Sequence, residues 1–410
     1  MRILLTAVYP YVFILLYIII PFDEYARALP NILMAFLVIA FPFVITKKDF
    51  NKLLLKPIIV LVLFFAYLLI NSFFQGNLDQ DLKIINKMMI PIGLVVLYLP
   101  VNNFKKLNKA IIFSSFIAIV YTLIQFVILI NKNSIVSLQF FQETVDAILI
   151  DRVYIGLLCV LSIIISYQSL STKFHPDNKY YLISIILNVL YLLLIMSKTA
   201  LIIVSTLIIL RQFYGAKKKL RLLITSAVII MICVFGYSKF QFEYNNIINS
   251  KKNISKVSYD NSNMPLGYRT LIWECASKII QESSNKFFGI GFRETDKLLV
   301  DCYKTEILDE LTKQNFITKR FNTHNQYLDF YISSGLISLL LFLGILLYLL
   351  LKYHKKFFPT SLIITIIIFG LVENFFHRQV GAYYFGFILV ILLINNRKGK
   401  IKDRLGFIIE

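Results

Sequence analysis

The stretch Ile3-Leu-Leu-Thr-Ala-Val-Tyr-Pro-Tyr-Val-Phe-Ile-Leu-Leu-Tyr-Ile-Ile-Ile20 decides the fold class, because it contains no charged residue. A helix needs about 20 predominantly apolar residues to cross the hydrocarbon core of a bilayer. Residues 182–196 and 339–351 are equally free of charge, and these runs lack the period-2 alternation of a membrane β-strand. The sequence therefore predicts an all-α integral membrane protein, since a helix satisfies its own backbone hydrogen bonds in lipid.

The composition favours the same class and excludes an ordinary soluble domain. Of the 410 residues, 58% are hydrophobic and only 16% are charged, and the mean hydropathy is +0.72. Apolar runs of spanning length predict about twelve transmembrane helices. We place them at 3–20, 31–45, 56–72, 83–99, 109–130, 152–168, 180–195, 197–212, 221–238, 326–351, 358–372 and 381–395.

Lys and Arg gather in every second connection, which indicates the orientation of the chain. The basic connections lie at 47–56, 105–109, 173–179, 211–221, 352–356 and 397–404. Because short basic loops stay preferentially in the cytoplasm, we expect a multi-pass membrane protein with both termini cytoplasmic. The net charge of +20 then reflects topology and contact with membrane lipids rather than binding to nucleic acid. No small-residue cleavage site follows residue 20, so we expect the first span to be retained.

A long hydrophilic interruption divides the chain into three predicted parts. They are nine spans in 1–238, a large periplasmic loop in 239–325, and three spans with a cytoplasmic tail in 326–410. A loop of this length is uncommon unless it is functional or disordered. Its first part, rich in Asn, Ser and Lys at 245–255, indicates flexibility. Residues 270–283 form an amphipathic pattern beside Trp273, suited either to the membrane interface or to packing against the span ends.

The four Cys restrict the chemistry only modestly. Cys275 and Cys302 both fall in the large loop, where an oxidising periplasm would allow a disulfide, and the sequence leaves open whether they pair. Cys159 and Cys233 fall within predicted spans, where we expect apolar packing. The chain has no CxxC motif and no two His at metal-ligand spacing, so we expect neither a metal nor a cofactor.

Charged side chains at the external ends of predicted spans and in the large loop are the candidates for chemistry, because charge near the membrane is costly. They are Arg152, Lys198, Arg269, Arg293, His324, Glu373, His377 and Arg378. Arg binds phosphate bidentately, and His accepts a proton from a hydroxyl near neutral pH. Cations around one imidazole therefore indicate a donor substrate that contains phosphate.

Each candidate also has a plain structural interpretation. A Lys or Arg at a span end can snorkel to lipid headgroups. His324 can pack at or cap a helix start, where Thr323 or Asn325 would cap equally well. Glu373 and His377 are four residues apart, so on a helix they would form a pair that is either structural or catalytic. The GxG at 289–291 lacks the flanking strand of a dinucleotide site, and it predicts a turn.

Four motifs follow one another in the second half of the chain. They are Tyr268-Arg-Thr-Leu-Ile-Trp273, Phe288-Gly-Ile-Gly-Phe292, Thr323-His-Asn-Gln-Tyr-Leu328 and Ser334-Gly-Leu-Ile-Ser-Leu-Leu340. Their order resembles the signature of the O-antigen ligase and O-antigen polymerase superfamily over most of residues 190–350. The His-Asn-x-Tyr-Leu element before a Gly-containing span is the specific part. The family's large periplasmic loop between spans nine and ten agrees with the layout predicted above.

The resemblance implies a metal-independent, inverting glycosyltransferase of the GT-C type. Such an enzyme moves a glycan from an undecaprenyl-pyrophosphate carrier to an acceptor hydroxyl on the periplasmic face. By motif, His324 would activate the acceptor, and Arg269 and Lys198 would hold the pyrophosphate. Lys198 departs from the family's usual Ser-Arg-Thr, because Lys keeps the charge but lacks the bidentate fork. Arg152 and Arg293 would compensate. The candidate supporting residues are Asn325, Glu373 and Arg378.

The shared motifs do not separate a ligase from a polymerase. A ligase delivers the finished glycan to the lipid A core, whereas a polymerase of O-antigen, capsule or exopolysaccharide extends the glycan on its carrier. The short external loop before the sixth span favours a ligase, and a relative that transfers glycans to protein ranks below both. A flippase for lipid-linked sugars is the competing class. Such transporters usually show two related halves and interrupted central spans, and the sequence shows no repeat.

Overall fold

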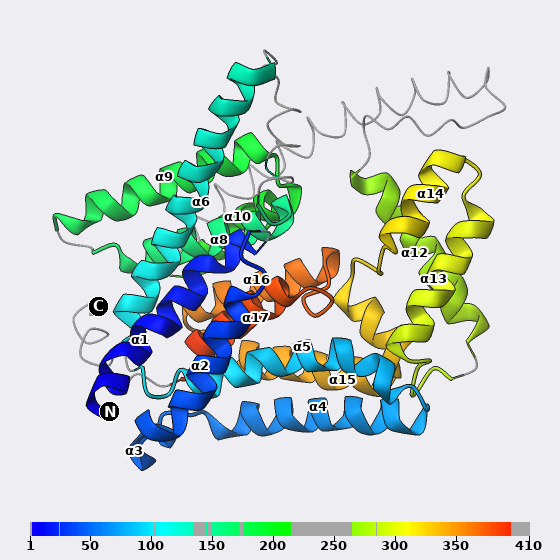
Figure 1. Cartoon of the computed structure of the whole chain (residues 1–410), viewed down its shortest axis with the longest axis horizontal. Helices are drawn as coiled ribbons and strands as arrows, with labels where there is room; N and C mark the ends of the chain where they lie inside the picture. The colour runs from blue at the N-terminus through cyan, green and yellow to red at the C-terminus, as the bar shows by residue number, and fades with distance from the viewer. Residues whose placement is uncertain are drawn as a thin grey trace.

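The computed structural model of the chain describes residues 2–23, 25–101, 103–133, 145, 149–171, 175–214, 265–283 and 285–394. Within these ranges every regular element is a helix, apart from an isolated bridge between Leu53 and Ile394. Figure 1 shows a bundle of long helices with a group of shorter helices, α12 to α14, at one end. The prediction of an all-α fold is confirmed for this part of the chain.

Every predicted span within the described ranges coincides with a helix. The helices of the bundle are α1 (Arg2–Ile19), α2 (Leu29–Val44), α4 (Leu55–Phe74), α5 (Leu78–Leu97), α6 (Phe104–Asn133), α8 (Arg152–Ser169), α9 (Asp177–Ile195), α10 (Lys198–Arg211), α15 (Gln326–Tyr353), α16 (Phe357–Val372) and α17 (Gln379–Leu393). Two short elements, η1 (Ile20–Phe22) and α3 (Lys47–Phe50), accompany them. The span expected at 221–238 and the flexible region expected at 245–255 lie outside the described residues.

Several of these helices are long and apolar enough to cross a membrane. Among the described residues there are 6 such segments, at Arg2–Phe22, Lys56–Phe74, Phe104–Asn131, Arg152–Ser169, Asp177–Ile195 and Gln326–Tyr353. The shorter apolar helices are α2, α16 and α17. The protein is thus a multi-pass helical membrane protein, while the total of about twelve spans and the sidedness stay predictions.

Helix α17 lies inside the bundle, and nearly all of its residues from 380 to 393 are buried. It packs closely on α5 at Gly386, where an added Cβ would lie 2.6 Å from Leu94 Cδ1 and 2.9 Å from Pro91 Cα. The outward faces of α4 and α9 expose large apolar side chains, for example Ile59 and Ile183. Such exposure is expected of lipid-facing helices, because lipid tails are as apolar as leucine.

The shorter helices α12 (Pro265–Glu282), α13 (Phe292–Glu306) and α14 (Glu310–Lys319) form a group beside the ends of α5 and α15 (Figure 1). Their small core is formed by Ile272, Ala276, Leu299, Tyr303 and Phe316, with Ile332 of α15. Cys275 and Cys302 form a disulfide between α12 and α13, with Cα atoms 5.9 Å apart. The helix expected at 270–283 therefore buries its apolar face against its neighbours in this group and against α15.

Helix α15 is broken at Gly335, where φ is 78° and ψ is −178°. Residues 285–291, which connect α12 to α13, fill the break. The Ile290 N–H donates to the Ile332 carbonyl oxygen at 3.0 Å, and neighbouring N–H and carbonyl groups of the two segments pair in the same way. Backbone groups released by the break are thus satisfied within the protein, which a helix at membrane depth requires.

The turn predicted at the GxG is confirmed. Gly289 and Gly291 both have positive φ, 73° and 93°, a conformation that side-chain-bearing residues rarely adopt. The end of α4 holds this turn, since Asn71 Nδ2 and Gln75 Nε2 each donate to the Phe288 carbonyl oxygen at 2.7 Å. The second and fourth motifs of the sequence therefore contact each other directly and attach the α12–α14 group to the bundle.

Candidate active site

His324 lies in the connection that leads into α15, in a left-handed conformation with φ 43°. Its backbone N–H donates to Asn322 Oδ1 at 2.9 Å. The indole N–H of Trp273, from α12, donates to the carbonyl oxygen of Thr323 at 3.0 Å. The first motif of the sequence therefore holds the third motif in place, and the strained backbone at His324 is fixed from both sides.

Asn325 caps α15, because its Oδ1 accepts the N–H groups of Tyr327 and Leu328 at 3.0 and 3.1 Å. The sequence left open which residue would cap this helix. Since Asn325 does so, the imidazole of His324 is free for other contacts. Its ring lies against Phe321, with ring centroids 5.8 Å apart.

His324 Nδ1 lies 3.1 Å from Oε2 of Glu373, the residue that follows the last turn of α16. The His324 side chain is 22% exposed and that of Glu373 only 9%. The other carboxylate oxygen of Glu373 accepts the Asn374 N–H at 3.1 Å. Within the described ranges no group hydrogen-bonds to His324 Nε2, so this nitrogen is the one available to a substrate.

The Glu373 carboxylate remains ionised. Burial raises its pKa, but the His324 ring, the Asn374 N–H and the nearby Arg269 together hold the pKa of Glu373 below its usual value. An ionised carboxylate accepts a hydrogen bond from the Nδ1–H of the imidazole, and in the neutral ring Nε2 then carries the free lone pair. The pair therefore favours the tautomer in which the accessible nitrogen is a base.

Arg269 comes from the N-terminal half of α12 and is half-buried. Its guanidinium lies close enough to the His324–Glu373 pair to lower the pKa of Glu373. Its Nε–H is fully buried and has no hydrogen-bond partner among the described residues. A buried N–H left unpaired is costly, and such a group in a native structure calls for a functional reason such as an anion that binds there.

The loop after α16 is fastened to the start of α15 by further contacts. Asn374, which is fully buried, donates from Nδ2 to Thr323 Oγ1 at 3.1 Å. The Phe376 N–H lies 3.4 Å from Gln326 Oε1. Tyr154 of α8 donates to the carbonyl oxygen of Asn374 at 3.2 Å. The loop that contains Glu373 is therefore held by α8 as well as α15.

The prediction that Glu373 and His377 pair on one helix is wrong. Helix α16 ends at Val372, and residues 373–378 form an irregular loop. Spacing by four brings side chains together only on a helix, and here Glu373 contacts His324 while His377 Nε2 lies 3.0 Å from Asp329 Oδ1. His324, which precedes α15, thus pairs with a carboxylate of the loop after α16, and His377 of that loop pairs with a carboxylate of α15.

The other cations predicted from the sequence lie at the starts of four helices, α10, α13, α8 and α17. Lys198 is exposed at the first residue of α10, and Arg293 is exposed in the first turn of α13, where its N–H donates to Asp81 at 3.0 Å. Arg378 pairs with Asp151, the N-cap residue of α8, next to the half-buried Arg152. The structure brings together His324, Glu373 and Arg269; in the described ranges the side chains of Lys198 and Arg293 do not contact them.

Asp329 and Lys87 were not predicted from the sequence, and both contact His377. Lys87 Nζ donates to the carbonyl oxygen of His377 at 2.6 Å. Both are charged residues inside predicted spans, at 326–351 and 83–99. That position was an available signal, because charges within spans are rare and commonly functional.

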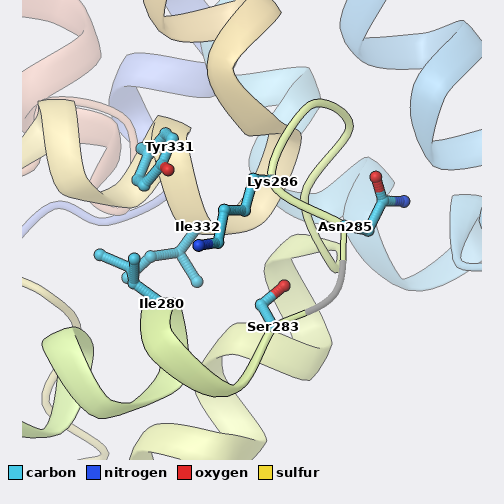
Figure 2. Close-up of a pocket in the computed structure, with 6 residues that line it drawn as sticks. All are labelled: Ile280, Ser283, Asn285, Lys286, Tyr331 and Ile332. Atoms are coloured by element: carbon cyan, nitrogen blue, oxygen red, sulfur yellow. The ribbon is translucent and has the colours of Figure 1, made fainter.

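Two cavities beside α12 have linings that do not include Arg269, His324 or Glu373. A cavity of about 10 Å³ lies between the end of α12, the loop that follows it and α15 (Figure 2). Its lining includes Asn285 and Lys286 of the loop and Tyr331 and Ile332 of α15. That volume suits about one water molecule. A groove of about 340 Å³ between α12 and α13 is lined by Glu282, Asp301 and other side chains distant in sequence from His324.

The fold and this geometry define a class of protein. It is a multi-pass membrane protein in which a His–carboxylate pair, from the start of α15 and the end of α16, lies beside an arginine of the α12–α14 group. Residues 183–343 match the family model described as O-antigen ligase, and this segment contains both Arg269 and His324. This match supports membership of the O-antigen ligase and polymerase superfamily, and a general function of the ligase or polymerase type. No curated protein matches the chain in sequence.

Proposed function

We propose that this protein is an O-antigen ligase-like glycosyltransferase. It moves a glycan from an undecaprenyl-pyrophosphate carrier to an acceptor hydroxyl of the lipid A core, on the periplasmic face of the bacterial inner membrane. The observation that supports this most directly is the His324–Glu373 contact beside Arg269, which leaves Nε2 as the ring nitrogen of His324 without a hydrogen-bond partner among the described residues. A base next to an unpaired guanidinium suits a hydroxyl nucleophile and a phosphate leaving group.

In the proposed step, His324 Nε2 takes the proton of the acceptor hydroxyl. The hydroxyl oxygen then forms a bond to the anomeric carbon while the bond from that carbon to the pyrophosphate oxygen breaks. The pyrophosphate leaves with the electron pair, and the attack from the opposite side inverts the anomeric carbon. Pyrophosphate is a good leaving group, so orientation and cationic stabilisation are the main requirements, and no metal is needed.

Arg269 is the residue we assign to the departing pyrophosphate. Its buried, unpaired Nε–H supports this role, since a phosphate oxygen would supply the missing acceptor. Lys198, Arg293, Arg152 and Arg378 belong to the same proposal as further cations around the donor. Lys198 and Arg293 have exposed side chains at helix starts, where they are accessible to a headgroup at the membrane surface.

Gene deletion followed by analysis of the glycans tests this proposal and separates its alternatives. If long glycans accumulate on the carrier while the lipid A core stays bare, the protein is the ligase. If single repeat units reach the core, the polymerase alternative holds. Carrier-linked sugars that stay on the cytoplasmic face would instead identify a flippase. A chromosomal copy with His324→Ala should reproduce the deletion phenotype at a normal level of membrane-inserted protein.

A further inference from the structure

A second His–carboxylate pair lies beside the proposed catalytic one and has the reverse arrangement. In the first pair, His324 precedes α15 and its partner Glu373 follows α16. In the second pair, Asp329 belongs to α15 and its partner His377 belongs to the loop after α16, with Nε2 and Oδ1 3.0 Å apart. The two pairs thus fasten the 373–378 loop to the start of α15 near both of its ends.

The second pair is more deeply buried than the first. The side chain of Asp329 is 2% exposed and that of His377 is 17% exposed. Gln326 Nε2 lies 3.4 Å from the second carboxylate oxygen of Asp329, so both oxygens have neighbours. A buried carboxylate needs such partners, because an unpaired charge away from water is strongly unfavourable.

The charged groups that act on His377 come from α15, α5 and its own loop. Asp329 on α15 pairs with its ring, and Lys87 on α5 donates to its carbonyl oxygen at 2.6 Å. Glu373 lies on its own loop, and the neighbouring Arg378 pairs with Asp151 at the start of α8. Burial lowers the pKa of His377 and Lys87 lowers it further, but Asp329 and Glu373 raise the pKa of His377 above its usual value overall.

We propose that the Asp329–His377 ion pair is a positioning device, which orients the 373–378 loop so that Glu373 faces His324. His377 and Asp329 then act on the transfer reaction through Glu373 and do not touch the substrate. This inference rests on the proposed function only for its activity readout. Buried ion pairs often contribute little to stability, whereas their directional contacts can select one arrangement of the chain.

The first test uses an apolar double variant, Asp329→Leu/His377→Phe, in the full-length protein in detergent. Replacing a buried ion pair with apolar side chains of similar size often preserves or raises stability, so this variant should fold. It removes one negative and one positive charge together, which keeps the net charge of the pair unchanged. We expect transfer of glycan from purified undecaprenyl-pyrophosphate donor to fall about tenfold in kcat, with the donor KM within about twofold of the original.

The second readout needs no catalytic activity. Diethyl pyrocarbonate modifies neutral histidine, and mass spectrometry resolves His324 from the other histidines. If Glu373 no longer faces His324, the ring loses its contact at Nδ1. The rate at which His324 reacts at a fixed neutral pH should then rise in the double variant. His175→Gln is the matched control, since His175 and its neighbour Asp177 are an exposed pair on another loop.

Three outcomes are distinguishable. A folded double variant with unchanged kcat and an unchanged rate of His324 modification would overturn the positioning role. Parallel losses of melting temperature and of transfer, with the rate of His324 modification unchanged, would show a purely structural role and also overturn it. If His324→Ala retains full transfer, the proposed function fails instead, while the modification experiment still tests the coupling of the two pairs.

Discussion

His324 Nδ1 and Glu373 Oε2 lie 3.1 Å apart although 49 positions separate them in the sequence. The contact joins the connection before α15 to the loop after α16. It also decides which nitrogen of the imidazole is protonated, because an ionised carboxylate accepts the Nδ1–H. A base with a fixed tautomer, beside the guanidinium of Arg269, is the arrangement on which the proposed transfer depends.

Removing either side chain of the proposed chemistry should abolish transfer without unfolding the protein. His324→Ala removes the base and Arg269→Ala removes the cation, and we expect each to lower product formation by about 10²-fold or more. Arg269→Lys should recover only part of the activity, since Lys keeps the charge but cannot bind phosphate bidentately. Lipopolysaccharide profiles of complemented deletion strains provide the measurement.

The matched control for these variants is Lys297→Ala, an exposed cation of α13 that is paired with Glu294. Its lipopolysaccharide profile should equal that of the original protein. Normal profiles from both His324→Ala and Arg269→Ala would remove the basis of the assigned roles.

Glu373→Gln should lower kcat by about 10²-fold at neutral pH, because an amide cannot fix the imidazole tautomer as a carboxylate does. In the original protein the folded-state pKa of Glu373 lies below the usual value for a glutamate. The stability that its ionisation contributes is therefore present above the unfolded-state pKa and is lost as pH falls through the folded-state pKa. Melting curves of the two proteins, recorded from neutral pH down to about pH 3, should differ more at the upper end of the range.

A difference in melting temperature that is constant with pH would contradict this assignment. Transfer assays across the same pH series provide the second comparison, since a wrong tautomer lowers kcat even where the fold is fully stable.

Gly335→Ala should destabilise the protein, whereas Gly344→Ala should not. A Cβ at residue 335 would lie 2.0 Å from the Phe287 carbonyl oxygen, in a backbone conformation with φ +78°. We expect a loss of about 1–3 kcal/mol from the backbone conformation alone, in addition to the displaced 285–291 loop. Gly344 lies later in the same helix with nothing within 4 Å of its would-be Cβ. Its replacement should be neutral or stabilising by roughly 0.5–1 kcal/mol.

Thermal unfolding in detergent measures both variants. Equal melting temperatures for Gly335→Ala and the original protein would show that the break in α15 is not needed to seat the loop.

Removal of the Cys275–Cys302 disulfide should loosen the α12–α14 group. The bridge joins positions 27 apart in sequence. In the chain-entropy description, closing a loop of that size stabilises the folded state by about 3 kcal/mol. Cys275→Ser/Cys302→Ser should therefore lower the melting temperature and increase proteolysis of the group. Cys159→Ser, at a buried thiol of α8, is a control for loss of a cysteine alone.

Transfer activity should fall with the disulfide, because α12 contains both Arg269 and Trp273. If the double Ser variant resists protease as well as the original protein does, the apolar core around Tyr303 and Phe316 is sufficient to hold the group.

The fold class and most helix positions could be predicted from the sequence. Runs without charge, such as 3–20 and 339–351, have few alternatives to a helix in lipid, because each backbone group must be bonded within its own segment. His324 and Arg269 were identified through motif order. The GxG as a turn also follows from local rules, since positive φ depends on a few neighbouring residues, whereas the sequence left open that Asn325 is the cap.

The partners of these residues were decided by the tertiary structure. The sequence placed Glu373 beside His377, but the end of α16 at Val372 sends Glu373 to His324 and His377 to Asp329. The break at Gly335 is satisfied only by residues 285–291, and the Cys275–Cys302 bond depends on how α12 meets α13. Local patterns determine which residues form helices, turns and caps because those interactions span a few positions. Which ionised groups meet depends on where separate helices end in space, and that is fixed by packing between segments far apart in the chain.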